Sequence, residues 1–306
     1  MNIVEFLKAF TLEPSHSPGD ASEAPRQTEV EWVEVDGRRY PRLINEYWTS
    51  RQRQSSSLHE IAYRACFKAQ LPRFFIRLLT SPGDVVFDPF SGRGTTIIEA
   101  ALLNRRVIAN DINPLSEILC RPRLFIPRLS EIETRLSEIP VDSQATADRD
   151  LSMFYHPRTE AEIVSLRRYL HRRRLTDNED AVDAWIRMVA TNRLTGHSPG
   201  FFSVYTLPPN QAVSPERQRL INARRNQQPP YRDTRALILR KSRSLLRHID
   251  EPLRRQLHAL GASARFLTAD ARSTPEIPSQ SVDLIVTSPP FLNVVQYAAD
   301  NWLRCW

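Results

Sequence analysis

The chain contains 306 residues, of which 41% are hydrophobic and 25% charged, and its formal net charge is +7 at pH 7. This composition is typical of a globular protein and excludes a disordered chain, and no apolar run is long enough to span a membrane. The three cysteines, Cys66, Cys120 and Cys305, form no C-x-x-C pair, so we expect neither a disulfide framework nor a metal site.

Residues 1–57 are predicted to form an N-terminal extension that contains a β-hairpin. A short helix precedes a linker rich in Pro, Ser and Glu over residues 13–28. Two strand-like runs, 30–35 and 38–43, then flank Asp36-Gly37. This dipeptide is a strong signal for a two-residue hairpin turn.

A strand, a glycine-rich turn, a helix and a second strand are predicted within residues 85–112. The strands are expected at 85–87 and 106–112, and the pair Gly92 and Gly94 opens the helix between them. Glycines after a strand let the backbone approach a ligand, and Asp111 at the end of the second strand can accept hydrogen bonds from ribose hydroxyls. These features predict a nucleoside-cofactor site. The alternative is that Asp111 is an ordinary turn aspartate.

Residues 119–261 are rich in arginine and predicted to be mainly helical. A helix is expected to begin at Ser214-Pro215, and a long one is expected over 234–260, ended by Gly261. The densest cluster of arginines consists of Arg167, Arg168, Arg172, Arg173 and Arg174. Such a cluster fits contacts with a polyanion, and a solvated helix face explains it equally well.

The α/β pattern then resumes with strands predicted at 265–268 and 282–286. The second of these leads directly into the sequence TSPPF at 287–291. A plain turn after the strand is the alternative explanation of this segment.

Two loop segments together resemble the cofactor loop and the catalytic loop of the S-adenosylmethionine-dependent DNA amino-methyltransferases. They are DPFSGRGTT at 88–96 and TSPPF at 287–291. The resemblance covers mainly residues 60–118 and 262–303. It implies an α/β fold with a Rossmann-like, doubly wound methyltransferase sheet, and double-stranded DNA as the substrate. Free cysteines suit a reducing cytoplasm, here a bacterial or archaeal one.

The resemblance implies S-adenosylmethionine rather than NAD as the cofactor. The implied cofactor residues are Phe67, Lys68, Asp88, Pro89, Phe90, Gly92, Gly94, Thr95, Asp111 and Asp270. Asp88 and the two glycines would surround the methionine part, Asp111 would hold the ribose, and Asp270 would contact the adenine. Phe67 and Lys68 resemble the segment that closes over the cofactor, and a core Phe beside a surface Lys is an equally good explanation.

The implied catalytic residues are Ser288, Pro289, Pro290 and Phe291. An exocyclic amino nitrogen is a poor nucleophile because its lone pair is delocalised into the ring, and an acceptor such as Ser288 favours the tetrahedral nitrogen. The prolines stiffen the loop and leave a carbonyl free to accept, while the aromatic ring stacks on an extruded base. No cysteine lies on a plausible catalytic loop, which excludes methylation at a ring carbon.

The first residue of this tetrapeptide predicts which base is modified. In the resembled family, Ser at this position is typical of cytosine-N4 enzymes, and Asp or Asn is typical of adenine-N6 enzymes. Ser288 therefore predicts methylation at cytosine N4, with adenine N6 as the alternative.

The resemblance divides the rest of the chain into parts of one methyltransferase domain. Residues 58–118 would be its cofactor-binding part, 262–306 its catalytic part, and 119–261 a helical insertion that is a candidate for target recognition. A complete methyltransferase sheet has more strands than the four predicted here, so we expect a sheet that is incomplete at the C-terminus. Truncation, a complementing chain or a minimal variant would explain this, and we favour the first two.

Other partners and other function classes stay open at this point. A restriction endonuclease would be a natural partner of a restriction-modification methyltransferase. The alternatives to an active enzyme of this kind are a non-catalytic DNA-binding subunit and an RNA or protein amino-methyltransferase.

Overall fold

The computed structural model describes residues 2–11, 27–47, 55–63, 66–207, 213–290 and 301–304. The chain divides into two compact units, residues 1–55 and residues 56–306, and each is described by itself.

The N-terminal unit contains a short helix and an antiparallel hairpin. Its elements are α1 (Ile3–Lys8), β1 (Glu29–Val35) and β2 (Arg38–Ile44). Asp36 and Gly37 connect the strands with φ angles of 49° and 74°. Two consecutive left-handed residues match the twist of a hairpin turn, so the predicted hairpin is confirmed.

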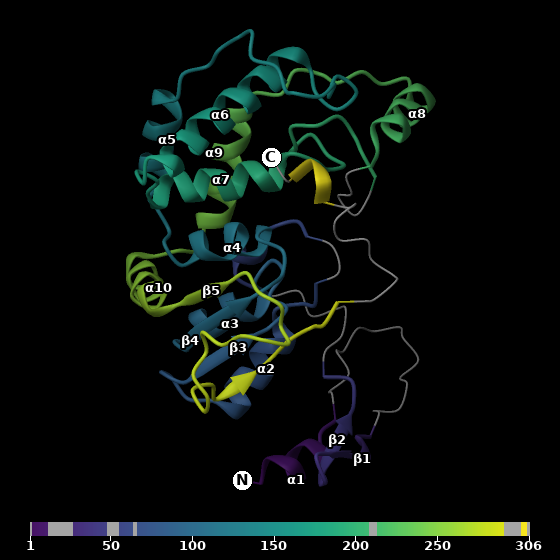
Figure 1. Cartoon of the computed structure of the whole chain (residues 1–306), viewed down its shortest axis with the longest axis vertical. Coiled ribbons are helices and arrows are strands. Elements are labelled where there is room, and N and C mark those ends of the chain that lie inside the picture. Colours follow the sequence, from purple (N-terminus) through teal and green to yellow (C-terminus); the bar gives the residue numbers. More distant parts are fainter. Residues whose placement is uncertain are drawn as a thin grey trace, which may run out of the picture. The chain divides into compact units, whose positions relative to one another are not determined.

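The second unit is built on a four-stranded parallel sheet with the order β5-β4-β3-β6. The strands are β3 (Val85–Asp88), β4 (Arg106–Asn110), β5 (Arg265–Leu267) and β6 (Leu284–Ile285). The four predicted strands are therefore present, and the α/β class with a parallel sheet is confirmed. Since the strands are parallel, the loops that follow all four lie at one edge of the sheet (Figure 1).

The two faces of the sheet are covered differently because side chains alternate along a strand. On one face, Val86 of β3 and Val107 of β4 belong to the main hydrophobic core, together with residues of α3. On the other face, Val85, Phe87 and Ile108 form a small separate cluster, against which Ile277 and Val282 of the β5–β6 connection pack.

Helices make up most of the remaining described chain. They are α2 (Gln70–Leu79), α3 (Thr95–Leu102), α4 (Leu115–Cys120), α5 (Leu129–Glu138), α6 (Pro157–Leu175), α7 (Ala181–Arg193), α8 (Pro215–Arg225), α9 (Thr234–Leu246) and α10 (Glu251–Ser263). Three short 3-10 helices are η1 (Ser57–His59), η2 (Arg121–Arg123) and η3 (Trp302–Arg304). Trp185 and Ile186 of α7 and Ile238 of α9 belong to the same core cluster as the sheet face that α3 covers, so the helices and the sheet share one core.

The prediction of one long helix over 234–260 was wrong, because the structure has two helices there. α9 ends at Leu246, and Asp250 caps α10 by accepting a hydrogen bond from the backbone N–H of Leu253. Pro252 lies in the first turn of α10, where its missing N–H costs nothing, whereas inside a continuous helix it would remove a hydrogen bond. Gly261 lies within α10 and does not end it. A glycine fits there because an added Cβ would lie 2.9 Å from the Phe125 ring.

Candidate active site

The loop between β3 and α3 is held in a shape that requires glycine at two positions. Gly92 and Gly94 have φ angles of 51° and 79°, which other residues rarely adopt. A Cβ at Gly94 would lie well inside 3.0 Å of the Cys120 sulfur, because α4 packs directly beneath the loop. The Arg123 guanidinium supports the loop from the same side by donating to the carbonyl of Arg93.

Asp111, which follows β4, holds this loop from the neighbouring strand. Its Oδ2 accepts a hydrogen bond from the backbone N–H of Gly92 at 2.8 Å, and its Oδ1 accepts one from Asn113 at 2.9 Å. Each carboxylate oxygen can accept more than one hydrogen bond, and the side chain is half-buried. Asp111 therefore orders the loop and keeps capacity to bind a ligand hydroxyl.

Asp88, at the end of β3, joins the glycine loop to the segment after β6. The side chain is 1% exposed, and its Oδ1 accepts from the Thr287 hydroxyl at 2.6 Å and from the Phe90 N–H at 3.1 Å. Thr96 of α3 adds a second link by donating to the carbonyl of Val286 at 3.1 Å. Burial raises the pKa of Asp88 to about 6, although the Thr287 hydroxyl opposes this shift.

These contacts bring both predicted loops to one cavity of about 180 Å³. Seven residues that the sequence singled out line it: Phe67, Phe90, Gly92, Thr95, Asp111, Ser288 and Pro290. The two loops therefore lie side by side at the same edge of the sheet.

Other residues implied by the resemblance lie outside the lining of this cavity: Lys68, Asp88, Pro89, Gly94, Asp270 and Pro289. Asp270 follows the edge strand β5 and pairs with Arg272 at 2.6 Å, and this hydrogen-bonded guanidinium lowers the pKa of Asp270 to about 2. Phe291 lies outside the described residues.

Sequence reasoning missed six residues that line the cavity: Tyr63, Cys66, Ser91, Arg93, Ile112 and Asn113. Four of them directly adjoin singled-out residues in the sequence, so proximity was an available signal: Cys66, Ser91, Arg93 and Ile112. Tyr63 carried no such signal, because it precedes the sheet and reaches Gly92 only through the tertiary fold, where a Cβ on that glycine would lie 3.4 Å from its ring.

Among the described residues, no group of three or more His, Cys, Asp or Glu side chains is arranged to hold a metal ion. In the same part of the chain, no helix has both the length and the apolar character required to cross a membrane.

Comparisons with known proteins match part of this chain. Residues 15–117 match the model of a family described as DNA methylase. The chain is 36% identical over 90 residues to the type II methyltransferase M.BsoBI of Geobacillus stearothermophilus, which covers 28% of this chain and 18% of the relative. It is 44% identical over 62 residues to the orphan methyltransferase M.BamHII of Bacillus amyloliquefaciens, covering 20% and 23% of the two chains.

A third relative is the type II methyltransferase M.PvuII of Proteus hauseri, 45% identical over 53 residues, or 17% of this chain and 16% of the relative. The chain thus spans about a fifth of the length of the curated relatives that it matches. No solved structure matches the chain.

Proposed function

We propose that this chain, which over residues 15–117 belongs to the DNA methylase family, transfers a methyl group from S-adenosylmethionine to an exocyclic amino group of a DNA base. The observation that carries the proposal is the hydrogen bond between Asp88 and Thr287, which joins the glycine loop to the TSPP segment beside one cavity. The parallel sheet is consistent with a Rossmann-like methyltransferase fold. Within that fold we assign residues 119–261 to an insertion that recognises the target.

The residues of the cavity fit a nucleoside cofactor. Phe67, Phe90 and Ile112 supply apolar wall for a purine ring, and the Asp111 carboxylate keeps acceptor capacity for ribose hydroxyls. The positive φ of Gly92 leaves the loop backbone without a side chain at this wall. When bound, S-adenosylmethionine supplies a methyl group on a positively charged sulfur.

The contribution of the TSPP segment is to hold the target nitrogen. The Ser288 hydroxyl lines the cavity and is able to accept a hydrogen bond from an amino group, which favours the tetrahedral nitrogen. Pro289 and Pro290 donate no backbone N–H and restrict the chain after Ser288, and the Asp88–Thr287 hydrogen bond fixes the chain before it. The rest of the acceleration would come from positioning of the two reactants.

The target is proposed to be cytosine N4, because Ser288 occupies the first position of the tetrapeptide. Adenine N6 is the alternative. Analysis of nucleosides from the DNA of cells that express the full reading frame separates them, since it yields N4-methylcytosine in one case and N6-methyladenine in the other.

The role of Ser288 is tested by transfer of labelled methyl groups to duplex DNA. We expect Ser288→Ala to lower the rate by about 100- to 1,000-fold, the usual effect of removing one group that stabilises charge in a transition state. Ser281→Ala is the matched control, because Ser281 lies before β6 and donates only to the carbonyl of Pro278. Equal rates for the two variants would remove Ser288 from the mechanism, and a full reading frame that leaves DNA unmethylated would refute the proposed function.

A further inference from the structure

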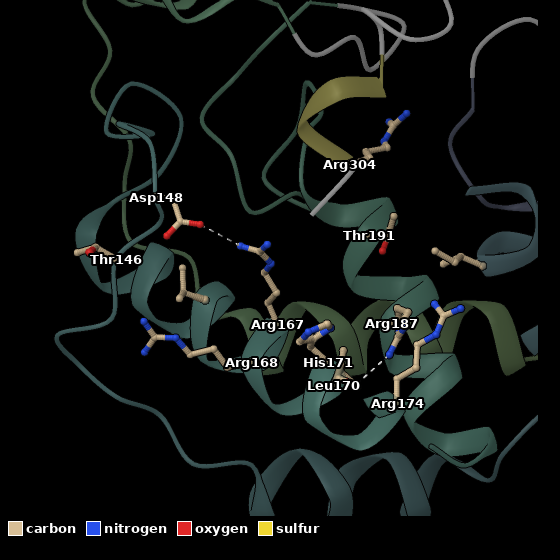
Figure 2. Close-up of a pocket in the computed structure, with 12 residues that line it drawn as sticks. Thr146, Asp148, Arg167, Arg168, Leu170, His171, Arg174, Arg187, Thr191 and Arg304 are labelled. Carbon is tan, nitrogen blue, oxygen red and sulfur yellow. Dashed lines mark hydrogen bonds and ion pairs between the residues drawn. The ribbon is translucent and has the colours of Figure 1, made fainter. Parts of the chain in front are cut away.

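A second cavity, of about 450 Å³, lies between α6, α7 and η3 and is lined by arginines (Figure 2). Five arginines line it: Arg167, Arg168 and Arg174 of α6, Arg187 of α7 and Arg304 of η3. His171 adds a further nitrogen-bearing side chain, and among the described residues of the lining Asp148 alone is acidic. The lining is therefore positively charged, with Arg168 and Arg187 paired to Asp142 and Glu179 just outside it.

Arg187, which lines the cavity, carries a buried N–H donor without a hydrogen-bond acceptor among the described residues. The side chain of Arg187 is 15% exposed, pairs with Glu179 at 2.9 Å and donates to the carbonyl of Leu170 at 3.0 Å. Its Nε is buried and has no hydrogen-bond partner among the described residues. Burial lowers the pKa of Arg187, so an anion held in the cavity would offset the cost of keeping this guanidinium charged.

The rim of the cavity has guanidinium groups that are weakly engaged. The Arg167 side chain is 48% exposed, and its closest carboxylate, on the almost fully exposed Asp148, lies 4.0 Å away. For Arg174, no carboxylate of the described residues lies within 4.0 Å. Exposed pairs at such separations contribute little, so both groups are available to a ligand.

The arginine cluster seen in the sequence does not act as a unit. Arg173 does not line the cavity. Its guanidinium is held by the buried Asp183 at 2.7 Å and by Asp180 at 3.4 Å. The tertiary structure thus replaces it in the cavity with Arg187 and Arg304, which come from elements distant in the chain.

Residues that line a third cavity connect the arginine cavity with the candidate active site. A cavity of about 790 Å³ lies between the two, sharing Val164 and Arg167 with the arginine cavity and Ile112 and Asn113 with the active-site cavity. A ligand that extends from one end to the other must carry negative charge at the arginine end. A small free anion would occupy only one of these cavities, whereas a nucleic-acid strand would reach from one to the next.

We propose that the arginine cavity binds backbone phosphates of the DNA strand whose base enters the active site, an inference that rests on the proposed function. Guanidinium groups match phosphate oxygens in pairs of parallel hydrogen bonds, which a pocket with several arginines exploits. The same chemistry would also accept free inorganic phosphate, so the experiment includes that ion as a separate probe.

The experiment measures the affinity of the full chain for a fluorescent DNA duplex, without cofactor, as a function of salt concentration. The cavity variant carries Arg167→Gln and Arg174→Gln. The control carries Arg217→Gln and Arg224→Gln on α8, which makes the same change of charge at exposed positions outside the cavity. All four side chains are exposed, so circular dichroism should show an unchanged fold in both variants.

Each lost phosphate contact should reduce the slope of log affinity against log salt by about 0.9. If two contacts are lost and the affinities of variant and wild type agree at 1 M salt, the variant should bind about 60-fold more weakly at about 0.1 M salt. We expect this loss for the cavity variant and a clearly smaller one for the control. Equal losses in both variants, or no loss in the cavity variant, would overturn the assignment.

Two further arms separate this inference from its competitors. If the cavity variant loses affinity for inorganic phosphate but keeps its affinity for DNA, the cavity binds a small anion and the proposal is wrong. If the cavity variant loses affinity for DNA while the wild-type chain binds DNA without methylating it, the cavity inference stands and the proposed function fails.

Discussion

Replacing Gly94 by alanine tests whether tertiary packing, and not only contact with a ligand, requires glycine in the loop. Gly94 precedes α3 with φ 79° and ψ 41°. The new Cβ would overlap the Cys120 sulfur and lie 3.2 Å from the Arg123 guanidinium. Both neighbours are completely buried, so neither side chain is able to move into solvent.

The expected cost has two separable parts. A left-handed conformation costs a residue with a Cβ about 1–2 kcal/mol, and forcing an extra carbon into a packed site costs about 1–3 kcal/mol. Gly94→Ala should therefore lower the free energy of unfolding by about 2–5 kcal/mol. Adding Cys120→Ala removes the overlapping sulfur and leaves the Cβ of residue 120 at 3.3 Å, so the double variant should recover the packing part only.

Urea unfolding of the wild type, the two single variants and the double variant forms a double-mutant cycle. We expect a coupling free energy of about 1–3 kcal/mol between positions 94 and 120. Gly83→Ala is the matched control, because Gly83 also has a positive φ of 94° but its Cβ would meet nothing within 4 Å, so it should not couple to Cys120. A coupling below about 0.5 kcal/mol at position 94 would refute the packing explanation.

Two further predictions concern buried carboxyl groups. Because burial raises the pKa of Asp88 from 3.8 to about 6, ionisation is less favourable in the folded state, and this group should lower stability by up to about 3 kcal/mol as the pH rises from 4 to 6. The difference in unfolding free energy between wild type and Asp88→Asn should therefore change over that pH window, and a difference independent of pH would contradict the assignment. Asp183 is completely buried between the guanidiniums of Arg135 and Arg173, so Asp183→Ala should cost about 3–5 kcal/mol in thermal or urea unfolding. Glu117→Ala, which breaks an exposed pair, should cost less than about 1 kcal/mol, and equal costs would show that burial is not decisive.

Local sequence signals were sufficient where a short segment determines its own conformation. Asp36-Gly37 specifies a hairpin turn because both residues tolerate positive φ. The strands of the sheet were recognisable as short apolar runs bounded by turns, and Ser214 before Pro215 marked the start of α8. The break between α9 and α10 also had a local signal, Asp250 followed by Pro252, which the longer helical pattern concealed.

The active-site cavity was only partly predictable. The loop motifs identified Asp111 and Ser288 through the family resemblance, and both line the cavity because loops after parallel strands meet at one edge of the sheet. The same reasoning did not distinguish Asp88, which turns inward and bonds Thr287, from a residue that faces the cavity.

Sequence alone predicted an α/β chain with two motif-bearing loops after its strands, since turn chemistry and strand patterns act over a few residues. Tertiary structure decided the rest, because burial and pairing depend on neighbours that are distant in the chain. It pairs Arg173 with Asp183 and brings Arg187 and Arg304 together in the lining of one cavity. The identity of a charged residue states what it is able to bind, and only its surroundings determine whether that capacity is already used.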